Sequence, residues 1–219
     1  MSAAPALLEP PDPGLVMDAA GFASLSGATP AQLADLERFR EILVDWNGRM
    51  NLVGASTLDG FWSRHVWDSA QLLTLAPGAL TWADLGAGAG FPGLVLAVLL
   101  KDRAGARVHL VESMARRCRF LSEVVAALEL PAQVHNARAE DVELKVDVVT
   151  ARAVAPLARL LTYAAPCFAR GARGLFLKGQ DIETEIAEAR AAWRFDADVI
   201  ASRSDPRGRI LCIERLSRA

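Results

Sequence analysis

From residue 80 onward, short apolar runs alternate with longer segments in which apolar residues recur every three or four positions. This alternation predicts a parallel β-sheet covered by helices on both faces. A late pair of runs joined by a turn at Arg207-Gly208 predicts an antiparallel hairpin that completes a mostly parallel, seven-stranded sheet. The expected strands are residues 80–84, 107–112, 133–135, 146–150, 174–177, 198–202 and 209–214. The expected helices of this part are residues 92–100, 113–128, 156–169 and 181–193.

The chain before residue 80 has helical periodicity instead. Thr29-Pro30 is typical of a helix start, with Thr29 as the N-cap and Pro30 as the first helical residue. An apolar stripe follows at helical spacing: Leu33, Leu36, Phe39, Leu43, Trp46 and Met50. A second helical region spans about 57–75, and a short helix is predicted near 15–25 within a segment rich in Ala, Pro and Gly. The expected organisation is a flexible tail (1–28), an N-terminal helical cap (29–78) and a sheet domain (79–219).

Composition narrows the class of protein. The chain has 219 residues and is 52% hydrophobic, enough for one domain with a packed core and an appendage. Its net charge of −2 does not indicate a nucleic-acid partner, so any basic surface that binds one must be local. Three scattered cysteines indicate reduced thiols and no metal site, and no uncharged apolar run is long enough to span a membrane. We expect a cytoplasmic monomer that binds no membrane.

The most informative stretch is 84–93, Asp-Leu-Gly-Ala-Gly-Ala-Gly-Phe-Pro-Gly. It follows a buried strand and precedes an apolar helix, and its glycines allow a sharp turn that a ligand can approach closely. The following helix N-terminus is expected to offer free N–H groups and partial positive charge. The stretch therefore predicts a site for a nucleotide-type ligand, with a glycine turn that binds nothing as the alternative.

Two nucleotide ligands fit this stretch to different degrees. Gly88-x-Gly90-x-x-Gly93, with Glu112 about 20 residues beyond, satisfies the dinucleotide fingerprint and taken alone indicates NAD. Asp84 argues against NAD, because a carboxylate beside the turn repels the pyrophosphate of a dinucleotide. The same carboxylate suits the ammonium and sulfonium groups of S-adenosylmethionine. We therefore expect S-adenosylmethionine, with Asp84, Gly86, Gly88 and Gly90 around it.

Further polar residues fall at the carboxyl ends of the predicted strands, where open parallel sheets bind their ligands. Glu112 follows the second strand and is expected to accept hydrogen bonds from the ribose hydroxyls. Ala139 and Glu140 follow the third strand and are expected to border the adenine. Arg152 and Lys178 follow the fourth and fifth strands.

Other charged residues allow two interpretations each. His65 and Asp68 are three positions apart and share a helix face, which suits either acid–base work or a structural pair that anchors the helix to the core. The structural pair is favoured because no nucleophile accompanies them. Arg116 and Arg117 stand in the first turns of a helix, where the dipole disfavours cations. They indicate either an external anion or a solvated face.

Several of these motifs together resemble the bacterial small-subunit ribosomal RNA (guanine-N7) methyltransferases of the RsmG/GidB family. The resemblance covers about residue 40 to the C-terminus. It departs from the usual pattern in having Val53 after Asn51-Leu52, and Arg for Lys at positions 116 and 117. The motifs that carry it are the 84–93 stretch, Asn51-Leu52-Val53, His65-x-x-Asp68-Ser69, Arg138-Ala139-Glu140, Arg152-Ala153-Val154 and Leu177-Lys178-Gly179.

The resemblance implies a class I S-adenosylmethionine-dependent methyltransferase fold, a Rossmann-like α/β architecture. It implies that the cofactor is bound by Gly86, Phe91, Ala139, Glu140 and Arg152. It also implies methylation of the N7 of a guanine in the decoding-region loop of small-subunit (16S) rRNA, on RNA or on an assembling 30S particle. Because N7 carries a lone pair and no proton, we expect no dedicated base, only alignment of the reacting atoms.

Arg152 is the candidate catalytic residue, placed to neutralise phosphate or polarise the guanine. Phosphate neutralisation supplies much of RNA affinity. The expected RNA contacts are Arg116, Arg117, Lys178, Arg207 and Arg209. Two other functions are kept open: an NAD-dependent oxidoreductase, and a non-catalytic RNA-binding module on the same fold.

Overall fold

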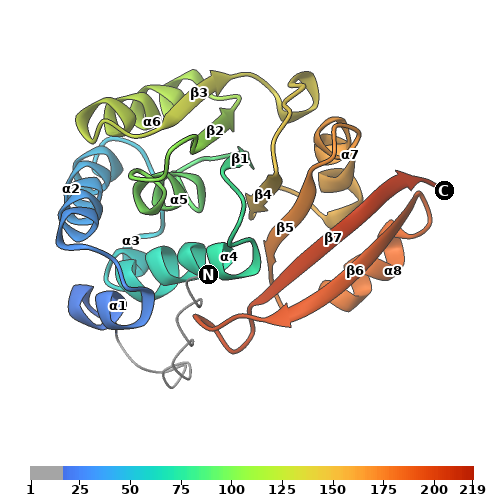
Figure 1. Ribbon diagram of the computed structural model, residues 1–219, viewed down its shortest axis with the longest axis horizontal. Coiled ribbons are helices and arrows are strands. Elements are labelled where there is room, and N and C mark those ends of the chain that lie inside the picture. The colour runs from blue at the N-terminus through green and yellow to red at the C-terminus, as the bar shows by residue number, and fades with distance from the viewer. Residues whose placement is uncertain (1–16) are drawn as a thin grey trace.

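The computed structural model describes residues 17–219, which form a seven-stranded sheet in the order β3-β2-β1-β4-β5-β7-β6 (Figure 1). The first five strands are parallel, and β7 runs antiparallel to both β5 and β6. The predicted sheet and its closing hairpin are therefore confirmed. The strands are β1 (Thr81–Leu85), β2 (Arg107–Glu112), β3 (Ala132–Asn136), β4 (Val148–Arg152), β5 (Arg173–Lys178), β6 (Trp193–Ala201) and β7 (Arg209–Arg218).

Helices cover both faces of this sheet, and the alternation of side chains along each strand explains why. Trp82 and Val148 pack into the hydrophobic cluster on the face covered by the N-terminal helices together with α5 (Gly93–Leu99) and α6 (Ala115–Ala127). Their neighbours Ala83 and Val149 pack into the cluster under α7 (Leu157–Phe168) and α8 (Ile182–Ala189). The helices of the sheet domain are α5 (Gly93–Leu99), α6 (Ala115–Ala127), η2 (Ala139–Asp141), α7 (Leu157–Phe168) and α8 (Ile182–Ala189).

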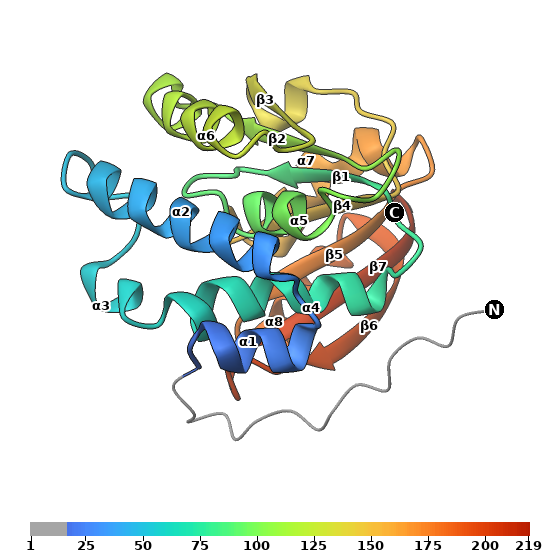
Figure 2. The same ribbon diagram turned by 60° about the vertical axis from the view of Figure 1, so that its left-hand side comes forward.

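The N-terminal helices form a layer on the same side of the sheet as α5 and α6: α2 (Pro30–Asn47) packs on both of these helices, and α4 (Asp68–Leu75) runs beside α5 (Figure 2). The predicted helix start at Thr29 is confirmed, because Thr29 and Gln32 form a reciprocal capping box. On α2, Phe39 is fully buried, with its ring 5.2 Å from that of Phe91 in the glycine loop. The helices of this layer are α1 (Ala19–Ser26), α2 (Pro30–Asn47), α3 (Ala55–Leu58), η1 (Phe61–Trp67) and α4 (Asp68–Leu75).

The expected flexible tail requires correction where the structure describes it. α1 (Ala19–Ser26) overlaps the short helix predicted near 15–25. Its Phe22 is fully buried, and the centroid of the Phe22 ring lies 5.6 Å from that of Trp62 and 6.4 Å from that of Trp67. Because a buried aromatic ring removes a large apolar area from water, residues 17–28 belong to the packed layer. The rest of the predicted tail, 1–16, lies outside the described residues.

Further boundaries also differ from the sequence prediction. The helical region 57–75 is divided into α3, the π-helical η1 and α4, with a turn at Asp59-Gly60. The helix expected over 181–193 ends at Ala189, and Trp193 begins β6 with only 3% of its surface exposed. In the part of the chain described, no helix combines the length and apolar character needed to cross a membrane.

Candidate functional site

The glycine loop after β1 is organised around Asp84. This residue is fully buried, and its Oδ2 accepts a hydrogen bond from the Gly93 N–H at 2.9 Å. Its Oδ1 has no hydrogen-bond partner among residues 17–219. Buried polar atoms are nearly always paired, so the free oxygen marks a place for a polar ligand.

The loop conformation depends on its glycines. At Gly90, with φ of +88°, a Cβ would lie 2.2 Å from Leu94 Cδ1. At Gly93 a Cβ would lie 2.3 Å from Leu110 Cδ2 and 2.7 Å from Asp84 Oδ2. Both spacings are far below van der Waals contact, so these positions accept only glycine.

The expected free N–H groups at the start of α5 require correction. The Gly93 N–H donates to Asp84, and the Leu94 N–H donates to the Gly90 carbonyl at 2.7 Å. A carboxylate thus occupies the position that a phosphate takes in a dinucleotide-binding loop. This arrangement disfavours a pyrophosphate and favours a ligand that carries positive charge.

Glu112, at the end of β2, joins two loops. Its Oε2 accepts from the Gly88 N–H at 3.1 Å and its Oε1 from the Met114 N–H at 2.8 Å. Arg117 lies 3.7 Å from the same carboxylate. Each carboxylate oxygen has a second lone pair, so Glu112 retains capacity to accept from ligand hydroxyls.

A cavity of about 290 Å³, here called the glycine-loop pocket, opens at the ends of β1, β2 and β3. It brings together four predicted cofactor residues: Gly86, Glu112, Ala139 and Glu140. Asp84, Gly88, Gly90 and Phe91 belong to the neighbouring glycine loop and do not line this cavity, and Arg152 lines a different one.

Sequence reasoning missed two residues of this cavity, Arg159 and Tyr163 on α7. The Arg159 guanidinium stacks on the Tyr163 ring, 5.5 Å from its centroid. Their i, i+4 spacing is a recognisable signal for a shared helix face. It does not indicate which cavity that face borders.

Burial governs the charge of Asp84. Desolvation raises its pKa to about 7, while the Gly93 hydrogen bond and the Arg152 charge lower it and the Glu112 charge raises it further. A carboxyl with a pKa near neutrality ionises readily when a cation arrives, which suits a ligand with ammonium and sulfonium charges.

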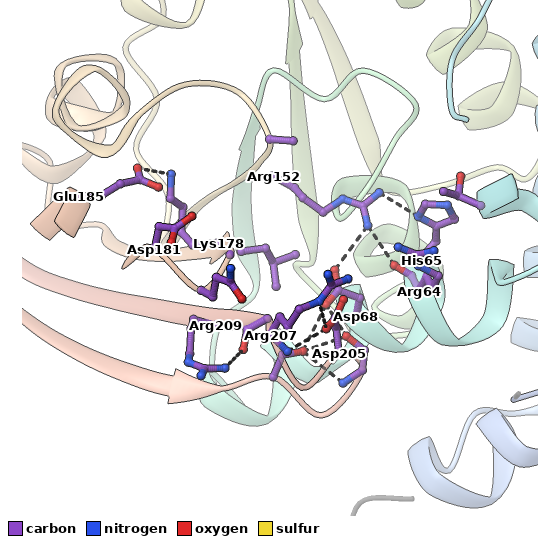
Figure 3. A pocket seen from close by; sticks show the side chains of 18 residues that line it. Arg64, His65, Asp68, Arg152, Lys178, Asp181, Glu185, Asp205, Arg207 and Arg209 are labelled. Atoms are coloured by element: carbon purple, nitrogen blue, oxygen red, sulfur yellow. Dashed lines mark hydrogen bonds and ion pairs between the residues drawn. The ribbon is translucent and has the colours of Figure 1, made fainter. Parts of the chain in front are cut away.

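A second cavity of about 510 Å³, here called the arginine pocket, lies at the ends of β4 and β5 (Figure 3). Its walls come from the η1–α4 region, from the segments after β4 and β5, and from the β6–β7 turn. Four arginines line it: Arg64, Arg152, Arg207 and Arg209.

Arg152 is held in a network that Figure 3 displays. Its guanidinium donates to His65 Nδ1 at 3.1 Å and lies 3.4 Å from Asp68 Oδ2. It also stacks 4.9 Å from the centroid of the Phe91 ring, against which His65 stacks at 4.5 Å. Phe91 thus connects the glycine loop to the arginine pocket.

His65 and Asp68 meet through Arg152, which supports the anchoring interpretation. Burial and the Arg152 charge lower the pKa of His65 to about 3, so the ring is neutral near pH 7 and accepts at Nδ1. Asp68 also accepts from the Ser204 hydroxyl at 2.6 Å. The pair orients an arginine and is not poised to exchange protons.

The five expected RNA contacts occupy different settings. Lys178 lines the arginine pocket but is nearly buried, with its ammonium 2.6 Å from Glu185. Arg207 is exposed, whereas Arg209 donates to the carbonyls of its own turn. Arg116 and Arg117 lie on α6 and do not line the arginine pocket. The structure therefore gathers three of the five.

Comparison with solved structures defines the class. The fold is similar to that of an S-adenosylmethionine (SAM) dependent methyltransferase from Aquifex aeolicus, with a TM-score of 0.54 and 15% identity over 68% of this chain and 89% of that one. Identity this low establishes the fold alone. The molecule has the class I methyltransferase fold, as expected.

Sequence comparison identifies the family within this class. The rRNA small subunit methyltransferase G (GidB) family model matches residues 32–205. Ribosomal RNA small subunit methyltransferase G of Caulobacter vibrioides is 63% identical over 206 residues, 94% of this chain and 95% of that protein. The same-named protein of Caulobacter sp. strain K31 is 58% identical over 213 residues, 97% and 95% of the two chains. The chain belongs to the rRNA small subunit methyltransferase G family.

Family membership confirms the resemblance drawn from the sequence and the expected methyltransferase activity. The two alternatives, an NAD-dependent oxidoreductase and a non-catalytic RNA-binding module, have no support in these comparisons.

Proposed function

We propose that this enzyme methylates the N7 of a guanine in the decoding-region loop of small-subunit rRNA, with S-adenosylmethionine as the methyl donor. The observation that carries the proposal is the fully buried Asp84 with one unpartnered carboxylate oxygen, beside a loop that has no room for Cβ atoms at Gly90 and Gly93. The residues fit a cationic adenosyl cofactor and disfavour a pyrophosphate.

The cofactor-holding roles divide among the residues around the glycine-loop pocket. Asp84 faces the positive charge, Glu112 accepts from the ribose hydroxyls, and Ala139 and Glu140 border the adenine. When bound, S-adenosylmethionine supplies an electrophilic methyl group on a sulfonium. Gly88, Gly90 and Phe91 keep the loop in the shape that this arrangement requires.

The arginine pocket receives the target nucleotide in this proposal. A guanine must leave its stack to enter such a pocket, and its N7 needs no deprotonation. Arg152 is held rigidly by His65 and Asp68, so its charge is preorganised for a nearby phosphate or guanine O6. Alignment is thus the main contribution of the protein.

RNA affinity is assigned to exposed cations around the same pocket. Arg207 stands at its rim and Arg209 beside it, while Arg116 and Arg117 offer a second contact region on α6. A single chain supplies both pockets, so we infer a monomer that acts on rRNA or on an assembling 30S particle.

The test is methyl transfer from labelled S-adenosylmethionine to 30S subunits and naked 16S rRNA from a strain that lacks this protein, followed by mapping of the modified nucleotide. We expect 7-methylguanosine at one site in the decoding region. Arg152→Met should lower kcat by about 10²-fold, a typical cost of losing a preorganised charge-stabilising donor. Lys145→Met, an exposed lysine outside both pockets, is the matched control. Methylation at another base or atom contradicts the proposal.

A further inference from the structure

The chain segment that follows β4 lies between the two pockets. Ala153 lines the arginine pocket, and Val154 and Ala155 line the glycine-loop pocket. Ala153 has φ of +55°, in the left-handed region that residues other than glycine rarely adopt. Such a conformation persists only where the surrounding contacts impose it.

Two ionic side chains hold the downstream part of this segment. The Lys178 ammonium donates to the Ala155 carbonyl at 3.3 Å and lies 2.6 Å from Glu185 Oε2. The same Glu185 oxygen accepts from the Leu157 N–H at 2.7 Å. Lys178 comes from the end of β5 and Glu185 from α8, so the pair ties two elements to one short stretch of backbone.

The upstream part is held as firmly. Arg152 immediately precedes Ala153 and is fixed by its contacts with His65 Nδ1 and Asp68 Oδ2. The strained residue therefore stands between two anchored positions, Arg152 and Ala155. Movement of segment 153–157 would change the walls of both pockets at once, since Ala153 lines one pocket and Val154 and Ala155 line the other.

The setting of Lys178 does not suit a phosphate contact. Only 11% of its side chain is exposed, and its ammonium already has a carboxylate and a carbonyl as partners. Binding a phosphate would require breaking a nearly buried ion pair and leaving Glu185 without its counter-charge, which is costly. Arg207, with 72% of its side chain exposed, is far better placed for that role.

We propose that Lys178 and Glu185 are positioning residues, which hold segment 153–157 so that the cofactor and the target base are aligned across it. Lys178 is then not an RNA contact, in contrast to the expectation from the sequence. The identity of the two ligands in this inference rests on the proposed function. The clamp itself, meaning the contacts of Lys178 and Glu185 with segment 153–157, does not depend on it.

The test compares Lys178→Met with the control Lys145→Met, both in the full chain. Calorimetry with S-adenosylhomocysteine measures the cofactor pocket, and steady-state methylation separates kcat from the KM for RNA. We expect a several-fold weaker affinity for S-adenosylhomocysteine and a kcat lowered by about 10- to 100-fold, since displacements of ~1 Å cost up to 10²-fold. The KM for RNA should change little.

Salt dependence of rRNA-fragment binding distinguishes positioning from phosphate contact. Loss of one phosphate contact on single-stranded RNA reduces the slope of log K against log salt by about 0.7. We expect no such reduction for Lys178→Met. A reduced slope with unchanged affinity for S-adenosylhomocysteine overturns the proposal, and so does the absence of any change in kcat.

Two conservative variants cover the case in which Lys178→Met does not fold. Glu185→Gln keeps an acceptor for the Leu157 N–H but loses the ion pair, and should reproduce the loss of kcat in milder form. Lys178→Arg keeps the positive charge and should retain most of the kcat that Lys178→Met loses. A merely space-filling role for Lys178 does not predict this difference between the two variants. If the wild-type enzyme methylates some other base, the proposed function fails, whereas the shift in S-adenosylhomocysteine affinity still tests the clamp.

Discussion

The glycine-loop pocket and the arginine pocket open at the ends of the same parallel strands, but they are assembled from very different parts of the chain. The first is built mainly by the loops after β1, β2 and β3, with backbone N–H groups bonded to the carboxylates of Asp84 and Glu112. The second takes residues from the N-terminal helices, from the ends of β4 and β5, and from the β6–β7 turn.

Their charges differ as well. Beside the glycine-loop pocket, Asp84 and Glu112 are buried and accept hydrogen bonds from backbone N–H groups, and Asp84 Oδ1 is left without a partner among residues 17–219. In the arginine pocket Arg152 and Lys178 are anchored by acids, whereas Arg207 is exposed. The comparison teaches that one region presents buried acids to its ligand, whereas the other combines an anchored arginine with an exposed cation at its rim.

The largest effect should come from neutralising Asp84, the buried acid beside the glycine loop. Asp84→Asn keeps an oxygen that can accept from the Gly93 N–H but removes the charge. We expect the affinity for S-adenosylmethionine, measured by calorimetry, to fall by roughly 10²-fold, as for loss of a hydrogen bond to a charged group. S-adenosylhomocysteine lacks the sulfonium charge and should lose less.

The matched control is Asp141→Asn, at an exposed acid that lines neither pocket. Equal affinities for S-adenosylmethionine in wild type and Asp84→Asn would remove the electrostatic role that distinguishes the two pockets.

A smaller effect should follow from pH. Burial raises the pKa of Asp84 to about 7, so the free enzyme carries the neutral acid below that pH and the carboxylate above it. A cationic ligand binds the carboxylate, so its affinity should fall by about tenfold per pH unit as the pH drops below ~7, and level off above it. The charged neighbours that set this pKa are Arg152 and Glu112.

The measurement is calorimetry with S-adenosylmethionine across pH 5.5 to 8.5, in wild type and in Asp84→Asn. The variant should show a flat profile over the range in which wild type changes. An identical pH profile in both proteins assigns the dependence to another group.

The same contrast explains how much of the site the sequence predicted. Asp84 and the glycines are close in sequence, and the strand-turn-helix pattern alone places them around one loop. Glu112, Ala139 and Glu140 followed from the rule that strand ends meet at one edge of a parallel sheet. The alternation of strands and helices, together with the late hairpin, predicted a mostly parallel sheet of seven strands but not the order of its strands.

What the sequence did not predict depends on partners distant along the chain. From its position after β5, Lys178 was expected to contact RNA. In the fold, Glu185 lies against its ammonium and pairs with it. Trp193 fits the end of a helix, yet packing against the core makes it the start of β6. Phe22 lies in a segment of tail-like composition, and only the positions of Trp62 and Trp67 account for its burial.

The smallest effect concerns the rim of the arginine pocket. Arg207→Met removes an exposed charge whose nearest carboxylate, on Asp205, is 3.6 Å away. We expect the affinity for an rRNA fragment to fall less than tenfold, the slope of log K against log salt to drop by about 0.7, and the affinity for S-adenosylhomocysteine to stay unchanged.

Arg116→Met is the informative companion, because Arg116 is exposed on α6 and donates to the Arg49 carbonyl at 2.8 Å. If RNA lies across both regions, the slope of log K against log salt falls by a similar amount in Arg116→Met as in Arg207→Met. The effects of the two variants then add, since distant sites act independently. If only Arg207 alters the slope, RNA engages the arginine pocket and not α6. If neither variant alters the slope, the rim is not a phosphate-binding surface, and the exposed cations of the arginine pocket have no separate role from its anchored centre.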